Sequence, residues 1–263
     1  MKRKEAKNVQ KITVEVCCGS AEDVAEAARG GADRAELNSD LFHGGLTPSA
    51  GELTTAKRAA DLPILVMIRP REGGFCYTET EFQTALADAE ILLRYGADGI
   101  VFGFLKEDGT VDTERCRQMM RVAGNREAVF HRAFDVVPDW RAALDQLCEI
   151  GIRRILTSGQ APSAPEGAET IAEMRRYARG RIQILPGAGI TARNIRRVLA
   201  ETGCPQAHIS PKRTAYDRSA DGNPEIFFGG TVRPPEDRYR RIDGDAVRTA
   251  VERLNGESGA GTL

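Results

Sequence analysis

The stretch Ala128-Val129-Phe130-His131-Arg132-Ala133-Phe134-Asp135 begins as a short apolar run and turns polar and ionisable within a few positions. This change from apolar to ionisable residues is typical of strands in an α/β barrel enzyme, because the carboxyl ends of the strands carry the side chains of the active site. A second histidine, His208, stands in a similar run over 206–210. The stretch therefore predicts a buried strand that delivers His131 to a pocket.

Working outward from this stretch, seven further segments read as strands, and each is followed by a helix or by a loop that leads to one. Strict alternation over eight units predicts a single closed (β/α)8 TIM barrel of the α/β class. A doubly wound open sheet is the weaker alternative, because no Gly-x-Gly-x-x-Gly follows the first strand. The predicted strands cover 12–17, 33–38, 63–68, 98–102, 128–131, 153–157, 181–185 and 206–210.

The chain of 263 residues reads as one domain over 12–257. The ends, 1–11 and 258–263, are predicted to be flexible tails. The segment 212–241 is rich in Gly, Pro, Asp and Arg, and it predicts a long irregular loop before a closing helix at about 245–254.

Composition and charge argue against two classes of protein, those that bind nucleic acid and those that span a membrane. The net charge is −1 and no basic stripe is present, so we expect no nucleic-acid partner. No run of about 18 apolar residues occurs, so we expect no membrane span. The six cysteines form no Cys-x-x-Cys pair. Together these features predict a cytoplasmic protein with reduced thiols.

Alternation along each strand predicts which side chains face the inside of the barrel at the carboxyl end. In this ring, Glu15 or Glu36 is a candidate general base, and His131 or His208 a candidate general acid or metal ligand. Arg69 is a candidate for holding a carboxylate or phosphate. The alternative is a polar plug whose charges only satisfy each other. The predicted ring contains Glu15, Cys17, Glu36, Asn38, Met67, Arg69, His131, His208 and Ser210.

The loops after the seventh and eighth strands form a second candidate site. They contain Gly187, Gly189 and Ser210, and Ser158 adds a hydroxyl after the sixth strand. Barrels often bind phosphate with these loops, because backbone amides approach the anion closely. The alternative is that the glycines only make tight turns.

Metal binding is a third possibility. The side chains Cys17, Cys18, His131 and His208 would suit copper or zinc. Cys17 and Cys18 are neighbours in a strand and point to opposite faces, so only one of them can face the pocket.

These motifs together resemble the CutC family of copper homeostasis proteins. The resemblance implies a TIM barrel, and it implies copper ligands at Cys17 and at the position of Asn38, where relatives carry Cys. His43 also departs from the family pattern. The matching runs are Glu15-Val-Cys17, 30–37, 44–49, 66–71, 96–103, 130–135, 154–159 and 186–189.

Two main functions are therefore expected. The resemblance implies copper binding and copper homeostasis, with Cys17 as a metal ligand. The residues favour a TIM-barrel lyase, isomerase or hydrolase that acts on a small phosphorylated or carboxylated metabolite. A third possibility is a homo-oligomeric scaffold that works through a dimer surface. In the enzyme hypothesis the catalytic residues are Glu15, Glu36, His131 and His208, and the substrate-binding residues are Arg69, Arg71, Arg132, Ser158, Gly187, Gly189 and Ser210.

Overall fold

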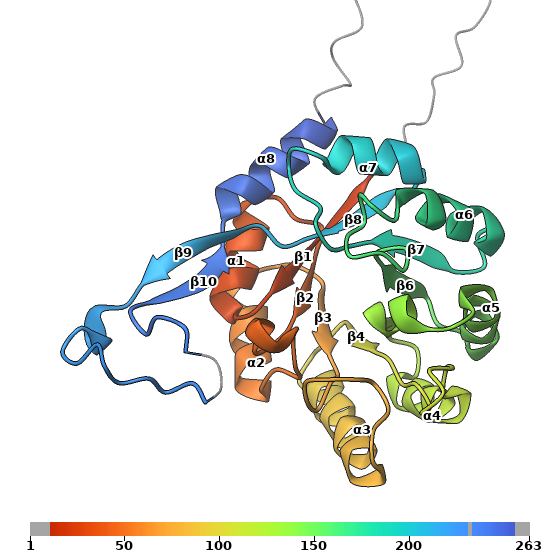
Figure 1. Cartoon of the computed structure of the whole chain (residues 1–263), viewed down its shortest axis with the longest axis horizontal. Helices are drawn as coiled ribbons and strands as arrows, with labels where there is room; N and C mark the ends of the chain where they lie inside the picture. The colour runs from red at the N-terminus through yellow and green to blue at the C-terminus, as the bar shows by residue number, and fades with distance from the viewer. Residues whose placement is uncertain (1–10, 231–232, 256–263) are drawn as a thin grey trace, which may run out of the picture.

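The computed structural model describes residues 11–230 and 233–255, so the predicted tails lie almost wholly outside the described residues. Strands and helices alternate around a (β/α)8 barrel (Figure 1). The barrel strands are β1 (Thr13–Cys18), β2 (Arg34–Leu37), β3 (Ile64–Met67), β4 (Gly99–Phe102), β5 (Glu127–Phe130), β6 (Arg154–Thr157), β7 (Gln183–Pro186) and β8 (Gln206–Ile209). The helices are α1 (Ala21–Arg29), α2 (Ala50–Ala59), α3 (Glu79–Arg94), α4 (Thr113–Ala123), α5 (Trp140–Ile150), α6 (Ala168–Ala178), α7 (Ile195–Thr202) and α8 (Gly244–Asn255).

The eight strands form one sheet with the order β7-β6-β5-β4-β3-β2-β1-β8, and all of its ladders are parallel. No ladder joins β7 to β8, although the two strands lie in contact and bring the barrel close to closure. This topology confirms the TIM barrel that strand alternation predicted. Across the described residues, no helix combines the length and apolar character needed to cross a membrane.

A recurring Gly-Ala-Asp sequence joins helices to strands. Gly31 and Gly96 adopt φ values of +82° and +99°, a conformation that favours glycine, and so end their helices. Asp33 then accepts a hydrogen bond of 2.9 Å from the amide of Val14, and Asp98 accepts one of 2.7 Å from the amide of Ile64. Each aspartate thus fixes an amide at the start of a neighbouring strand.

The interior of the barrel is divided into two sectors. Strands β3 to β7 contribute an apolar sector, which consists of Leu65, Met67, Val101, Val129, Leu156 and Leu185. Strands β8, β1 and β2 contribute a polar sector instead, and Arg154 of β6 joins it. Because burying charge is costly, the members of this sector require partners. The buried polar side chains of this sector are Glu15, Arg34, Glu36, Arg154, Gln206 and His208.

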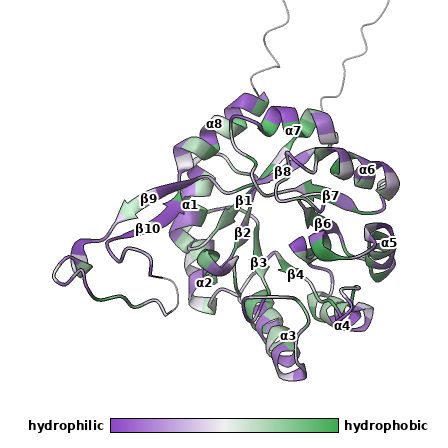
Figure 2. Cartoon of the chain, viewed as in Figure 1, coloured by the Kyte–Doolittle hydropathy of each residue, from purple (hydrophilic) through white to green (hydrophobic). Residues whose placement is uncertain are grey.

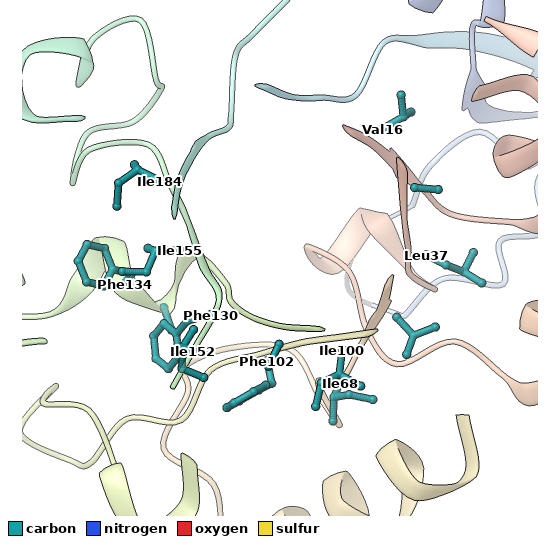
Figure 3. Packing of buried hydrophobic residues seen from close by; sticks show 14 of the residues in the cluster. Val16, Leu37, Ile68, Ile100, Phe102, Phe130, Phe134, Ile152, Ile155 and Ile184 are labelled. Carbon is teal, nitrogen blue, oxygen red and sulfur yellow. The ribbon is translucent and has the colours of Figure 1, made fainter. Parts of the chain in front are cut away.

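The main hydrophobic core lies between the barrel and its helices. The opposite faces of the strands carry apolar side chains such as Val16, Leu37 and Phe130, which point away from the barrel interior (Figure 3). Hydrophobic residues accordingly gather on the strands, whereas the helices also carry hydrophilic stretches (Figure 2). This shell holds the strands in place and leaves the barrel interior free to carry polar chemistry.

The segment 212–241 differs from the irregular loop that its composition predicted. Its ends form an antiparallel hairpin of β9 (Lys212–Tyr216) and β10 (Arg238–Ile242), which extends from the barrel beside α1 (Figure 1). The amide of Ile242 donates to Asp23 of α1 at 2.7 Å, which fixes the base of the hairpin. The irregular loop predicted from the Gly- and Pro-rich composition is therefore found only in the middle of this segment.

Helix α7 begins at Ile195, four residues after Thr191. The amide of Thr191, in the loop before this helix, donates to the Asn194 side chain at 2.8 Å. This local hydrogen bond uses the amide that a helix N-terminus would otherwise offer to an anion.

Candidate functional site

A cavity of about 460 Å³ opens at the carboxyl end of the strands. Its position is the one where TIM-barrel enzymes bind their ligands. Side chains from most of the barrel strands and backbone of the loops after them form its wall. The lining residues are Cys17, Glu36, Asn38, Gly44, Met67, Arg69, Phe75, His131, Arg132, Leu156, Ala188, Gly189, Ile190, Thr191, His208 and Ser210.

The strand register brings the polar residues of β8, β1 and β2 side by side. Glu15 pairs with His208 of β8, and Cys17 pairs with Glu36 of β2. Successive inward-facing positions are two residues apart, so Glu15 lies one layer below Cys17. Glu15 does not line the cavity but supports residues that do.

Glu15 is the centre of a buried charge network. Its carboxylate forms an ion pair with Arg34 and accepts a hydrogen bond from Nδ1 of His208 at 2.7 Å. Burial alone would raise the pKa of Glu15, but the Arg34 guanidinium and the His208 hydrogen bond outweigh it and hold the pKa at about 2. Glu15 is therefore an ionised carboxylate that orients His208.

Cys17, Glu36 and His208 form a compact group of potential ligands. The Cys17 sulfur, a Glu36 carboxylate oxygen and a His208 ring nitrogen all lie within 4.8 Å of one another. Burial raises the pKa of the Cys17 thiol and the pKa of Glu36. Burial opposes charge on His208, yet Glu36 and the bonds to Cys17 and Glu15 raise its pKa well above the usual value. The group thus holds protons that a metal ion would displace.

Asn38 lies beside this group at the end of β2. Its Nδ2 atom donates to a Glu36 carboxylate oxygen at 3.0 Å and lies 3.6 Å from the Cys17 sulfur. Asn38 therefore holds Glu36 and Cys17 in place. The thiol that the resemblance implied at position 38 is replaced here by a hydrogen-bond donor.

His131 contributes a neutral hydrogen-bond donor on another part of the wall. Its Nδ1 atom accepts from the Ala133 amide at 3.1 Å, so in the neutral ring the proton is on Nε2. Burial, with the nearby charge of Arg69, lowers the pKa of His131 to about 3. Nε2 is buried without a hydrogen-bond partner in the described part of the chain. A bound ligand with an acceptor oxygen would satisfy it.

The two arginines in the cavity wall are already tied to the protein. Arg69 donates to the backbone oxygens of His43 at 3.1 Å, Gly45 at 3.1 Å and Gly73 at 2.8 Å, so it links two loops. Arg132 donates to Asp135 at 2.8 Å and to Ser158 at 2.9 Å. Both cations are fixed in position; Asp135 offsets the charge of Arg132, whereas Arg69 is held by neutral backbone oxygens.

Several predicted substrate-binding residues lie outside the cavity wall. Arg71 forms an ion pair with Glu81 at 2.6 Å and donates to three backbone oxygens. Ser158 is bonded to Asp135 and Arg132. Gly187 does not line the wall either, and a Cβ added there would lie 2.6 Å from Cδ1 of Leu156.

The loop after β7 does reach the cavity, as its glycines indicated. Gly189 and Ser210 both line it, as do Ala188 and Thr191. Ala188 has a φ of +70°, which is uncommon for a residue with a side chain. Such strained backbone is found preferentially at functional sites.

Sequence reasoning missed the layer below the cavity. Arg34 and Arg154 are buried inside the barrel, where they form ion pairs with Glu15 and Glu127. The same alternation that placed Glu36 inside also places Arg34 there, two residues earlier. Alternation along β2 is therefore the sequence signal that places Arg34 inside the barrel.

The comparisons with known proteins agree with this geometry. The model of the CutC family matches residues 12–213, which is most of the chain. The protein belongs to the CutC family. A Treponema denticola protein named as a family protein CutC is 49% identical over 246 residues, which cover 94% of this chain and all of that protein. The human copper homeostasis protein cutC homolog is 42% identical over 236 residues, covering 90% of this chain and 86% of that protein.

Solved structures extend the comparison to the fold. A crystal structure described as a putative copper homeostasis protein CutC from Streptococcus agalactiae has a TM-score of 0.72 and 34% identity, covering 75% of this CutC chain and 97% of that chain. A phosphoribosylanthranilate isomerase from Thermotoga maritima has a TM-score of 0.54 at 13% identity, covering 93% of this chain and 99% of that chain. The second likeness shows the barrel fold alone.

Proposed function

We propose that this CutC-family protein handles copper by binding the ion at Cys17, Glu36 and His208. The observation that carries the proposal is the convergence of a thiol, an imidazole and a carboxyl group within 4.8 Å in a pocket wall. The human relative is named a copper homeostasis protein, which agrees with this donor set. Copper is the cargo in this proposal.

The chemistry of the donors fits a copper ion. Thiolate and imidazole ligands suit Cu(I), and imidazole with carboxylate suits Cu(II). The same set would also accept Zn²⁺, so selectivity between the two metals is part of the test. Because Asn38 supplies no second thiolate, we expect weaker Cu(I) binding than a site with two thiolates would give.

Glu15 provides the support that metal-binding histidines usually have. A histidine ligand commonly donates its other ring N–H to a carboxylate, which fixes the ring and makes the free nitrogen more basic. Glu15 holds Nδ1 of His208 in this way at 2.7 Å. In this proposal Nε2 of His208 is the ligand atom, and Glu15 is a positioning residue.

Anaerobic competition titration with a Cu(I) chelator tests the proposal. We expect tight binding of one ion and a marked loss of affinity in Cys17→Ser. Cys76→Ser is the matched control, because Cys76 is an exposed free thiol outside the cavity wall. Equal affinity in the wild type and Cys17→Ser, or equal loss in both variants, would contradict the proposal.

A second candidate function is acid–base catalysis on a small anionic metabolite. The observation that favours it is the buried, neutral His131 with its unpartnered Nε2 in a cavity of about 460 Å³. A cavity of this volume suits a small organic molecule, whereas a bare metal ion would fill only a small part of it. Ligands with a carbonyl group and a carboxylate or phosphate would complement both His131 and the fixed charge of Arg69.

The cavity residues can divide the work of proton transfer. Nε2–H of His131 would donate to a substrate carbonyl oxygen and stabilise the negative charge that develops there. Glu36, with its raised pKa, is the stronger base of the two β-strand carboxylates and lines the cavity, whereas Glu15 does not. Glu36 would therefore take a proton from the carbon next to the carbonyl, with His208 beside it.

Exchange of substrate hydrogen for deuterium in D₂O tests this second function. A panel of 2-keto acids and phosphorylated keto compounds would be followed by NMR, so no product need be known in advance. We expect exchange that Glu36→Gln abolishes and that His131→Asn slows by roughly 10²–10³-fold, the loss typical for one oxyanion donor. Exchange that persists unchanged in Glu36→Gln would contradict this role.

A further inference from the structure

A second cavity lies at the opposite end of the barrel, where the strands begin. Its volume is about 610 Å³, and it is formed by the first residues of β1, β2, β6, β7 and β8 and by the last turn of α6. Its lining contains six cationic side chains and, among the described residues, no carboxylate. The cations are Lys11, Arg34, Arg154, Arg175, Arg176 and Arg179.

Three of these cations form ion pairs with carboxylates that do not line the cavity. Lys11 pairs with Asp33 at 2.5 Å, Arg34 pairs with Glu15, and Arg154 pairs with Glu127. Arg34 and Arg154 are buried and fixed, so they form a rigid floor. Their guanidinium groups supply donors in a geometry that matches phosphate oxygens.

The other three cations have no such compensation. Arg175, Arg176 and Arg179 are exposed, and no ion pair joins them to a carboxylate in the part of the chain that the structure describes. Arg175 and Arg176 lie in the last turn of α6, Arg179 is the residue that ends the helix in a left-handed conformation, and all three line the cavity. Three like charges over a cavity repel one another unless an anion is present.

We propose that this cavity is a binding site for a compact polyanion that carries two or more phosphate groups. Its volume falls within the range of small-molecule sites, and its excess of about three positive charges matches a diphosphate. The α6 arginines would clamp the outer phosphate, and the buried Arg34 and Arg154 would face the inner one. The site is separate from the cavity at the carboxyl end and does not depend on the function proposed for it.

Basic residues in the last turn of a helix also offset the helix dipole, which is the competing explanation for these arginines. That role would require no ligand and no cavity. The two explanations differ in a measurable way, because only a built site gives saturable binding with a fixed stoichiometry.

Isothermal titration calorimetry of the full-length, metal-free protein with inorganic pyrophosphate tests the proposal. We expect one saturable site whose affinity falls as salt concentration rises. The double variant Arg175→Gln/Arg179→Gln should lose at least about tenfold in affinity, since each lost charge-assisted hydrogen bond contributes more than a neutral one. The single variant Arg176→Gln should show a smaller loss.

The chain offers a matched control on α4. Arg117 and Arg121 are exposed and four residues apart, as are Arg175 and Arg179, but neither lines the cavity. Arg117→Gln/Arg121→Gln should leave pyrophosphate binding unchanged. Equal weakening in both double variants would show nonspecific attraction to basic surface and would overturn the proposal. The absence of saturable binding to the wild type would overturn it as well.

Discussion

Nδ1 of His208 lies 2.7 Å from Oε1 of Glu15, although 193 residues separate the two in the chain. Parallel pairing of β1 with β8 creates this contact and closes the polar sector of the barrel. The same glutamate is paired with Arg34 on its other oxygen. The orientation of His208 therefore depends on a carboxylate that the cavity does not expose, and its charge depends on both Glu36 and Glu15.

Glu15→Gln should lower the pKa of His208, because one of the two carboxylate charges that stabilise the imidazolium is removed. It should also weaken copper binding by about 10–100-fold, the usual effect of losing such a support. The unpaired Arg34 left behind should reduce the free energy of unfolding by roughly 3–5 kcal/mol. Histidine NMR titration, metal competition and denaturant unfolding would measure these three effects. An unchanged His208 pKa would contradict the assigned role of Glu15.

Copper binding should strengthen as pH rises. The pKa values of Cys17, Glu36 and His208 are all raised, so protons compete with the metal. For each proton released, affinity should increase by about tenfold per pH unit. Calorimetry in two buffers with different ionisation enthalpies would count the protons, and Cys17→Ser should release fewer. Binding that is independent of pH would rule out this ligand set.

The buried His131 should make the protein less stable in acid. Its pKa is about 3 in the folded state against an ordinary 6.5, so the unfolded chain binds the proton more readily. Stability from this residue is complete above pH 6.5 and is lost as pH falls toward 3. At pH 5 the loss should be roughly 2 kcal/mol.

His131→Asn is the variant that tests this effect, because its side-chain oxygen can still accept from the Ala133 amide. Its unfolding free energy should depend less steeply on pH between 6.5 and 4 than that of the wild type. Parallel pH profiles for the two proteins would show that the pKa of His131 is the same in the folded and unfolded states, and would contradict the prediction.

Gly103 should not tolerate a side chain. A Cβ there would lie 2.4 Å from Cε1 of His131 and 2.9 Å from the Cβ of Ala133, so the imidazole would have to move. Gly103→Ala should cost about 1–3 kcal/mol of unfolding free energy. Gly74→Ala is the control, because nothing lies within 4 Å of its added Cβ. A similar cost for both variants would show that contact with His131 is not the cause.

The fold was predictable from local patterns because each of its rules acts over a few residues. Glycines with positive φ, such as Gly31 and Gly96, end helices, and alternation of side chains marks the strands. Alternation along β1 and β2 also placed Glu15 and Glu36 inside the barrel, as found. Composition was a poorer guide at 212–241, because the pairing of β9 with β10 depends on residues more than twenty positions apart.

The sequence by itself determined the barrel, its inward-facing residues and the presence of polar side chains at the strand ends, because strand alternation and helix termination are local. Only the tertiary structure decided which of those residues work together. Strand register placed Glu15 beside His208 and left it outside the cavity, and it brought Cys17 to Glu36. The partners of Arg69 and Arg71, and the gathering of cations at the opposite end, arise from loops and helices that meet only after the barrel closes.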